Sequence, residues 1–246
     1  MLGFVAVLIV SGVDGMFHKL RCGNRFIKEN PFLVIMQTLE CIRTRRSVRK
    51  FLDKPVEFEN LGNVLDAGRL APSAGNIQDW KFILVTDGAK REELANACAQ
   101  QVWMANAPAH IVVCADKKSE RLYGERGEKI YLIQNSAAAV ENMLLAAHDQ
   151  GLGACWVSAF DEEMVRRALV IPSDVIPQAV VVLGYADEKP EFPSKFTLEE
   201  VTYVEKWGAR IKDMEAFLGY YYKNVMKIAD VGKTTLKRIL EKLKPK

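Results

Sequence analysis

The chain has 246 residues, of which 49% are hydrophobic and 26% are charged. This composition is close to that of average globular proteins, so it excludes intrinsic disorder, a collagen-like repeat and a coiled coil as descriptions of the whole chain. Lys and Arg total 34 against 31 Asp and Glu, and the resulting net charge of +3 is too small to indicate nucleic-acid binding by itself. The positive charge gathers at the two ends, because residues 1–35 and 211–246 are basic while the body between them is mildly acidic.

Apolar residues spaced three and four apart predict helices, and short apolar runs predict strands. In chain order, the expected elements are a short helix near Leu39, a helix at 58–68, a strand at 81–86, a helix at 91–100, a strand at 110–115, a long helix at 130–150, a strand at 154–158, a short helix after Asp161 and a strand at 179–185. The turn-forming residues at 71–79 predict an irregular loop. Strands alternate with helices, which favours a sheet covered by helices.

The five cysteines, at positions 22, 41, 98, 114 and 155, are widely spaced and include no Cys-x-x-Cys pair. They resemble neither a disulfide framework nor a zinc site, so we expect no metal centre and a reducing, cytoplasmic location. The apolar stretch at 2–10 is about half as long as a membrane-spanning helix must be. We therefore expect no integral membrane association.

The first candidate functional segment is the basic cluster Arg45-Arg46-Ser47-Val48-Arg49, directly after the first short helix. Three guanidinium groups and a hydroxyl within five residues suit a phosphate group, which they can bind through charge-assisted hydrogen bonds. A solvated basic patch without a ligand is the alternative. RNA binding is less favoured, because no aromatic residues for base stacking lie between the arginines.

The second candidate segment is the loop at 71–80, which contains Ser73, Asn76 and Gln78 together with a glycine. Hydroxyl and amide groups of this kind can read the polar edge of a heterocycle. An ordinary surface loop of the same composition is the alternative.

Two glycine-containing segments do not fit nucleotide-binding motifs. Gly232-Lys233-Thr234 lacks the P-loop glycine five residues upstream, where Lys227 stands, and Gly151-Leu152-Gly153 follows a predicted helix and not a strand. A Ser–His–Asp arrangement stays open, although no nucleophile-elbow sequence surrounds any serine. No side chain stands out as an acid, base or nucleophile, which is typical of chemistry carried by a cofactor.

Five short segments follow the patterns of one protein family, in order along the chain. R-R-S-x-R-x-F is matched at 45–51 and P-S-x-x-N-x-Q-x-W at 72–80. N-M-L-L-A-A at 142–147, G-L-G-x-C-W at 151–156 and V-V-L-G-Y at 181–185 are the other three matches. Together these segments resemble the FMN-dependent nitroreductase family, and the likeness covers residues 36–207, about 70% of the chain.

The resemblance implies an α+β fold, a three-layer α/β/α sandwich with a mainly antiparallel central sheet. It also implies an intertwined homodimer that binds FMN at the subunit interface, with the helix at 130–150 as the expected dimer core. Residues 36–207 form the expected FMN-binding domain. Residues 1–35 are an N-terminal extension of open status, since family chains begin near Met36, the expected true start. Residues 208–246 are expected to form a basic amphipathic helical extension that embraces the partner or packs on the surface, with contact to anionic lipid or nucleic acid as the alternative.

The basic cluster is expected at the phosphate end of FMN. By the resemblance, Arg45 and Arg46 hold the phosphate, and Ser47 bonds the phosphate or the ribityl chain. Arg49 is expected beside the pyrimidine, where its charge would stabilise the negative charge of the reduced ring.

Three further positions complete one subunit's contribution. Ser158 and Ala159 match the family's contacts to flavin N5 and O4, through backbone N–H groups. Lys195 is the expected third phosphate contact, in a position where many relatives have arginine. Lys189 is its competitor.

The partner subunit is expected to supply the loop residues Pro72, Ser73, Asn76 and Gln78 to the isoalloxazine edge. Asp79 stands where many relatives have proline, in a loop that is expected to face the substrate cavity.

The implied activity is that of an FMN-dependent oxidoreductase, which uses NADH or NADPH to reduce a small electron-poor acceptor, a nitroaromatic or a quinone, by ping-pong hydride transfer. No catalytic side chain is expected, since flavin N5 carries the chemistry, and no nucleic-acid partner is expected. One alternative is a flavin-dependent dehydrogenase or dehalogenating reductase with a dedicated substrate, for which residues 120–129 are the candidate lid. Another is a non-catalytic flavin-binding sensor or interaction module.

Overall fold

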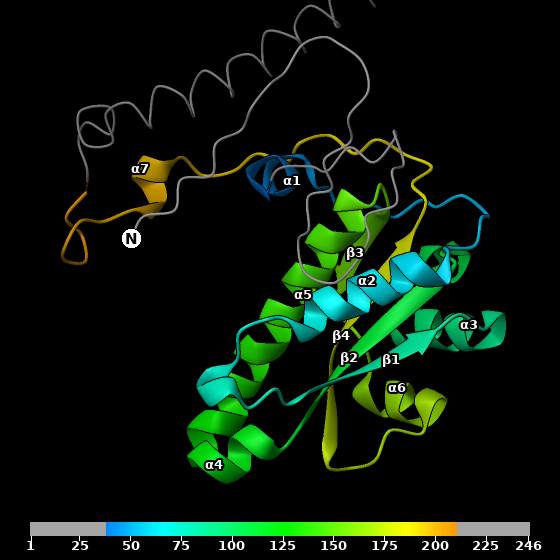
Figure 1. Cartoon of the computed structure of the whole chain (residues 1–246), viewed down its shortest axis with the longest axis horizontal. Coiled ribbons are helices and arrows are strands. Elements are labelled where there is room, and N and C mark those ends of the chain that lie inside the picture. The colour runs from blue at the N-terminus through cyan, green and yellow to red at the C-terminus, as the bar shows by residue number, and fades with distance from the viewer. Residues whose placement is uncertain (1–37, 211–246) are drawn as a thin grey trace, which may run out of the picture.

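A four-stranded antiparallel sheet forms the centre of the structure, a computed structural model that describes residues 38–210 (Figure 1). Its strands are β1 (Trp80–Val85), β2 (Ala109–Asp116), β3 (Gly153–Val157) and β4 (Val175–Gly184). They lie in the order β1-β2-β4-β3, and each neighbouring pair is antiparallel. This pairing confirms the predicted mainly antiparallel sheet.

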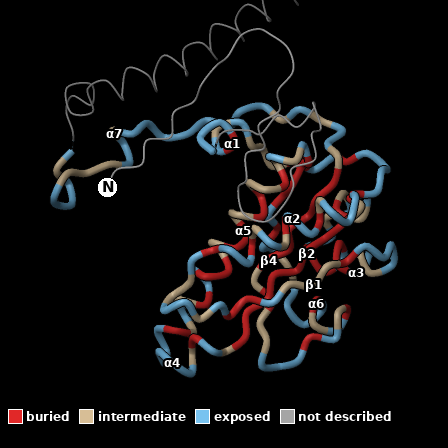
Figure 2. The backbone as a smooth tube through the Cα atoms, in the orientation of Figure 1, coloured by how far each residue is buried: buried red, intermediate tan, exposed pale blue. Residues whose placement is uncertain are grey.

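The strand β2 is buried along its entire length, so its side chains alternate between two covered faces. Ile111 and Val113 belong to one apolar cluster, whereas Val112 and Cys114 belong to another. Figure 2 shows the buried residues concentrated in the sheet and in the helices that cover it. A sheet covered on both faces confirms the predicted three-layer α/β/α sandwich.

Helices α2 (Phe58–Arg69) and α5 (Leu132–Asp149) cover the first face of the sheet. Leu61 of α2 and Met143 of α5 are buried in the same apolar cluster. Gly68 allows the two helices to approach closely, because an added Cβ at this position would clash with the Met143 side chain. Burial of both apolar faces against the sheet stabilises the pair.

Helices α3 (Gly88–Ala97) and α6 (Glu162–Leu169) cover the second face. Each begins at an aspartate, Asp87 or Asp161, whose side chain accepts a hydrogen bond from a backbone N–H in the first turn. Such N-caps satisfy donors that the helix itself leaves unpaired. Leu94 of α3 is completely buried in the cluster on this face.

Shorter elements lie around this core. They are α1 (Thr38–Thr44), η1 (Ala74–Asn76), η2 (Val102–Asn106), α4 (Lys118–Arg126), η3 (Gly127–Tyr131) and α7 (Leu198–Val201). After α1, the chain runs beside β3, where Ser47 forms a parallel bridge with Ala154. Figure 1 shows α7 well away from the sheet, at the end of a long segment that follows β4.

The predicted elements are present, with two clear errors in their bounds. The strand β4 begins at Val175, four residues before the predicted start, because Pro177 interrupts the apolar run from which the strand was predicted. The helix predicted at 91–100 lies at Gly88–Ala97, and Ala99 and Gln100 adopt positive φ angles of 54° and 55°, which end it. The candidate lid at 120–129 falls within α4 and η3.

The predicted extension at 1–35, the expected start at Met36 and nearly all of 208–246 lie outside the described residues. The division of the chain into these parts therefore stays a prediction, as does the homodimer. Within residues 38–210, no helix combines the length and the apolar character needed to cross a bilayer.

Candidate functional site

A cavity of about 470 Å³ lies at the C-terminal end of α5. Its walls come from the end of α1, the end of α5, the start of β3 and the segment after β4. The polar and charged side chains that line it are Thr44, Arg45, Arg46, His148, Glu188 and Lys189. Its volume is in the range typical of small-molecule and cofactor sites, roughly 300–1,000 Å³.

Arg45 and Arg46 follow α1 directly and bring two guanidinium groups to the cavity. Arg45 Nε lies 3.8 Å from Glu141 Oε1, too far for a hydrogen bond, so this side chain has donors available for a ligand. Arg46 is more constrained, because Nη1 donates to the carbonyl oxygens of Arg43 and Arg45 at 2.8 and 2.6 Å. Its guanidinium also stacks on the Phe192 ring, with 4.5 Å between them.

The electrostatics of the cavity wall around Arg45, Arg46 and His148 favour binding of an anion. Burial, and then the neighbouring Arg45 charge, lowers the pKa of Arg46. His148 Nε2 shares a hydrogen bond of 2.8 Å with Thr44 Oγ1. Burial and the two arginines also lower the pKa of His148, so the ring is neutral at pH 7 and can serve as a donor or an acceptor. An anion between the guanidinium groups would relieve their mutual repulsion.

Sequence reasoning missed His148 and Glu188. His148 lies 104 residues from Thr44, and the spacing of the histidines carried no signal for it. The carboxylate of Glu188 accepts hydrogen bonds from the backbone N–H groups of Arg49 and Lys50, at 2.5 and 3.0 Å. It therefore ties the segment after β4 to the basic cluster.

Ser47 and Arg49 do not line the cavity, although Val48 between them does, and the Arg49 backbone N–H donates to the cavity-lining Glu188. Because the bridge between Ser47 and Ala154 is parallel, the chain from Ser47 to Arg49 runs in the direction of β3. Ser158 follows the end of that strand, about 13 Å from Ala154 at 3.3 Å per residue. The basic cluster therefore stays beside the cavity wall, whereas Ser158 lies beyond the far end of β3.

The predicted site residues after β3 and β4 lie on exposed segments. Ser158 and Ala159 are exposed, and Trp156 Nε1 donates to Ser158 Oγ at 2.5 Å. Lys195 is exposed and does not line the cavity, whereas Lys189 does. The structure therefore brings the competitor, Lys189, and not Lys195 to the two arginines.

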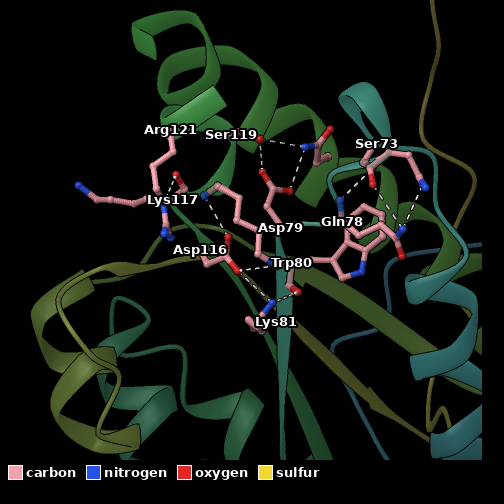
Figure 3. A network of polar contacts seen from close by, with 12 residues as sticks. Ser73, Gln78, Asp79, Trp80, Lys81, Asp116, Lys117, Ser119 and Arg121 are labelled. Carbon is pink, nitrogen blue, oxygen red and sulfur yellow. Dashed lines mark hydrogen bonds and ion pairs between the residues drawn. The ribbon is translucent and has the colours of Figure 1, made fainter. Parts of the chain in front are cut away.

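The loop between α2 and β1 carries the other predicted residues, of which Figure 3 labels Ser73 and Gln78. Ser73 Oγ accepts a hydrogen bond from the Gln78 backbone N–H at 3.0 Å, and Gln78 Nε2 donates to Asn76 Oδ1 at 3.1 Å. Asn76 and Gln78 adopt positive φ angles of 55° and 52°, which are uncommon for residues other than glycine. Pro72, Asn76 and Gln78 are exposed, so this preformed loop can contact a ligand or a second chain.

One chain does not bring the loop and the cavity together. The loop is attached near the start of α5, where the Ala74 backbone N–H donates to Asn135 Oδ1 at 2.9 Å. The cavity lies at the other end, beside His148. These attachment points are 13 residues apart, about 20 Å along the helix axis.

Asp79 differs from the exposed residues of this loop, because its side chain faces the interior of the fold. Its side chain is completely buried and hydrogen-bonded to Ser119 and Asn135. A carboxyl group that has found buried donors is no longer available to a substrate.

Cysteine chemistry does not explain the site. Burial raises the pKa of Cys98 and of Cys114 to about 12, so neither is a thiolate at neutral pH. Neither residue lines the cavity. The arrangement is suited to holding a phosphate-bearing ligand and not to covalent catalysis by these thiols.

Comparison with known proteins gives a consistent result. The family model described as "Nitroreductase family" matches residues 42–116 and 99–185. A protein of Methanothermobacter thermautotrophicus, named as an NADH dehydrogenase/NAD(P)H nitroreductase, is 36% identical over 176 residues, which are 70% of this chain and 88% of that protein. The FMN reductase (NADPH) of Bacillus subtilis is 28% identical over 184 residues, 68% of this chain and 74% of that protein.

Among solved structures, an NADH dehydrogenase/NAD(P)H nitroreductase from Parabacteroides distasonis is similar, with a TM-score of 0.62 and 32% identity. The match covers 70% of this chain and 99% of that one. The family match spans more than half of the chain, and it includes both the basic cluster and the loop at 72–78. This chain therefore belongs to the nitroreductase family.

Proposed function

We propose that this protein is an FMN-dependent oxidoreductase, which takes electrons from NADH or NADPH and delivers them to a nitroaromatic or quinone acceptor in a ping-pong cycle. The coarser assignment, an NAD(P)H-dependent oxidoreductase, follows from the family and from the names of its relatives. The observation that carries the finer proposal is the cavity with Arg45, Arg46 and Lys189 on its wall.

The residues present fit FMN. Two guanidinium groups and an ammonium group suit a terminal phosphate, which takes charge-assisted hydrogen bonds from them. Ser47 lies beside the start of β3 and Ser158 follows its far end, a spacing that supports a phosphate at one end of the ligand and a flavin ring at the other. When bound, FMN supplies a ring that accepts hydride from a reduced nicotinamide and passes electrons to a second substrate.

The chain's own residues would bind and orient this cofactor. Arg45 is ion-paired with Glu141 at 3.8 Å but keeps donors for a ligand, and Arg46 is held in place by two carbonyl groups and by Phe192. The neutral His148 ring, beside Thr44, can accept a hydrogen bond or donate one to a phosphate oxygen without adding charge. Arg49, at the pyrimidine end, would stabilise negative charge on the reduced ring.

The complete site is formed by two chains in this proposal. The loop that carries Ser73, Asn76 and Gln78 is attached about 20 Å from the cavity along α5, so a copy of the loop from a partner subunit would close the site. Such a homodimer would hold two FMN molecules, each between the basic cluster of one chain and the loop of the other.

Mixing two variants tests this arrangement. Arg45→Ala and Asn76→Ala homodimers should each bind FMN poorly, because each lacks part of both sites. After joint unfolding and refolding, half of the dimers are mixed, and each mixed dimer has one intact site. Tight FMN binding should therefore return at about a quarter of all sites in a symmetric dimer.

The matched control is a mixture of Arg45→Ala with Arg46→Ala. These changes fall in the same half-site, so mixed dimers contain no intact site and should recover nothing. If the first mixture also recovered nothing although mixed dimers formed, the site would not be shared between chains.

The identity of the cofactor and the turnover need separate measurements. Heat-released cofactor should run as FMN on chromatography, and recovery of FAD, or of no flavin after reconstitution, would contradict the proposal. Purified holoprotein should lose its flavin absorption under anaerobic NADH or NADPH and regain it with a quinone. A bound flavin that neither nucleotide reduced would identify a flavin-binding sensor and not an oxidoreductase.

A further inference from the structure

The side chain of Asp79 connects three parts of the chain in a buried position (Figure 3). Asp79 Oδ2 accepts a hydrogen bond from Ser119 Oγ, in the first turn of α4. Asp79 Oδ1 accepts one from Asn135 Nδ2 of α5 at 2.9 Å, and Asn135 Oδ1 in turn accepts the Ala74 backbone N–H at 2.9 Å. One carboxyl group thus connects α4, α5 and the loop that ends at β1.

The connection is made by neutral donors. Asp79 has no ion pair within residues 38–210, since the nearby Lys81 and Lys118 ammonium groups pair with Asp116 at 3.0 and 3.3 Å. Burial of a carboxyl group is costly unless its oxygens are hydrogen-bonded, so losing either partner would leave a buried acceptor without a donor. The stability of the fold therefore depends on both hydrogen bonds to the Asp79 carboxyl group.

Two close packing contacts place α4 and its Tyr123 side chain against the loop at 73–78. An added Cβ at Gly127 would clash with the Ser119 carbonyl oxygen, so the turn after α4 folds back onto the residue that Asp79 holds. An added Cβ at Gly75 would clash with the Tyr123 hydroxyl, so Tyr123 of α4 lies directly against the loop. The Tyr123 ring is partly exposed and packs edge-to-face on Tyr131, with 5.2 Å between centroids.

We propose that Asp79 is a positioning residue that holds α4, and with it Tyr123, against the loop at 73–78. Through this contact it sets the shape of the acceptor side of the flavin site, because Tyr123 is the exposed aromatic ring nearest to Gly75 of that loop. The first half of this inference concerns the chain alone. The second half rests on the proposed function, which places the loop at the edge of the flavin.

Substitutions at Asp79 and Ser119 distinguish the hydrogen bond to α4 from the hydrogen bond to α5. Asp79→Ala removes both hydrogen bonds, and Ser119→Ala removes only the link to α4. Asp79→Asn keeps an acceptor for Asn135 and places an amide opposite the Ser119 hydroxyl, which can accept from it. Asn142→Ala is the matched control, because Asn142 also lies on α5 and its Nδ2 donates to the Ala67 carbonyl oxygen at 3.1 Å, away from the loop.

Backbone hydrogen exchange of the full chain tests the positioning directly. Asp79→Ala should speed exchange about tenfold or more in both 118–127 and 73–78, whereas Ser119→Ala should do so in 118–127 alone. The double variant should exchange no faster in 118–127 than Ser119→Ala does, because Ser119→Ala already removes both the Asp79 contact and the 3.4 Å hydrogen bond that Asn135 Nδ2 donates to Ser119 Oγ. Asp79→Asn should stay within about twofold of the unmodified chain.

The selectivity of the holoprotein tests the second half. The ratio of kcat/KM for p-benzoquinone to that for the bulkier menadione should change about fivefold in Asp79→Ala and Ser119→Ala. Asn142→Ala and Asp79→Asn should leave this ratio unchanged. A loss of stability without a positioning role would lower both values together and leave the ratio where it was.

The outcomes are distinct. If Asp79→Ala or, should that variant not fold, Ser119→Ala matched Asn142→Ala in both exchange and selectivity, the inference would be wrong. If exchange changed and selectivity did not, Asp79 would hold α4 without shaping the acceptor side, and the proposal as stated would fail. A wild-type chain that bound no FMN would overturn the proposed function, and exchange would still decide whether Asp79 holds these segments.

Discussion

The buried imidazole of His110 makes this protein's stability depend on pH in a defined window. His110 lies on β2 and is completely buried, and its Nε2 shares a hydrogen bond of 2.9 Å with the Met104 carbonyl oxygen. Its Nδ1 is also buried and has no partner among the described residues. Burial, opposed by the Met104 carbonyl and assisted by the Arg91 charge, lowers the pKa of His110 to about 4.

The direction of this pH dependence follows from the pKa of His110 in the folded chain and in the unfolded chain. In the unfolded chain, histidine has a pKa of 6.5, so between pH 6.5 and 4 the unfolded state binds the proton and the folded state does not. Stability is therefore complete above pH 6.5 and falls as the pH is lowered towards 4. The loss is about 2 kcal/mol at pH 5 and reaches about 3 kcal/mol at the bottom of the window.

The assay compares the unmodified chain with His110→Gln in urea at pH 8 and pH 5, at one protein concentration. The glutamine amide can still donate to the Met104 carbonyl but does not titrate, so other groups cancel in the comparison. Between pH 8 and pH 5, the unmodified chain should lose about 2 kcal/mol more than the variant. Equal losses in the two proteins would show that His110 is not the group that titrates.

Three further predictions concern binding, strain and packing. Arg45→Ala should weaken FMN binding by about 2–4 kcal/mol, which raises the dissociation constant roughly 30- to 1,000-fold. Flavin fluorescence titration measures this constant, and an unchanged value would remove Arg45 from the site. Gly75→Ala should lower the free energy of unfolding by about 1 kcal/mol or more, because φ is +55° and the new methyl group meets the Tyr123 hydroxyl. The loss should be smaller in a Tyr123→Phe background; the same loss in both backgrounds would leave backbone strain as the whole cause. Met104→Ala should cost about 2–5 kcal/mol in urea unfolding, because Met104 is completely buried, and a loss under 1 kcal/mol would mean that the core collapses around the gap.

Secondary structure and the chemistry of the basic cluster could be read from the sequence because both depend on neighbouring residues. The spacing of Leu61 and Val64 marks the buried face of α2, and the run at 110–115 marks the buried strand β2. Errors arose where a local signal was interrupted. Pro177 hid the start of β4, and the positive φ angles after Cys98 ended α3 without any glycine or proline to announce it.

The contacts that assemble the candidate site depend on packing between distant segments, which no local pattern encodes. Folding brings His148 to Thr44, and Glu188 to the backbone of Arg49, across more than 100 residues. It places Lys189 and not Lys195 at the cavity, and it turns Asp79 inward to Ser119 and Asn135. Composition and periodicity determined which segments are helices, strands and candidate ligand-binding loops. Only the tertiary structure decided which polar groups meet, because a buried donor or acceptor takes whichever partner the packed sheet and helices bring within reach.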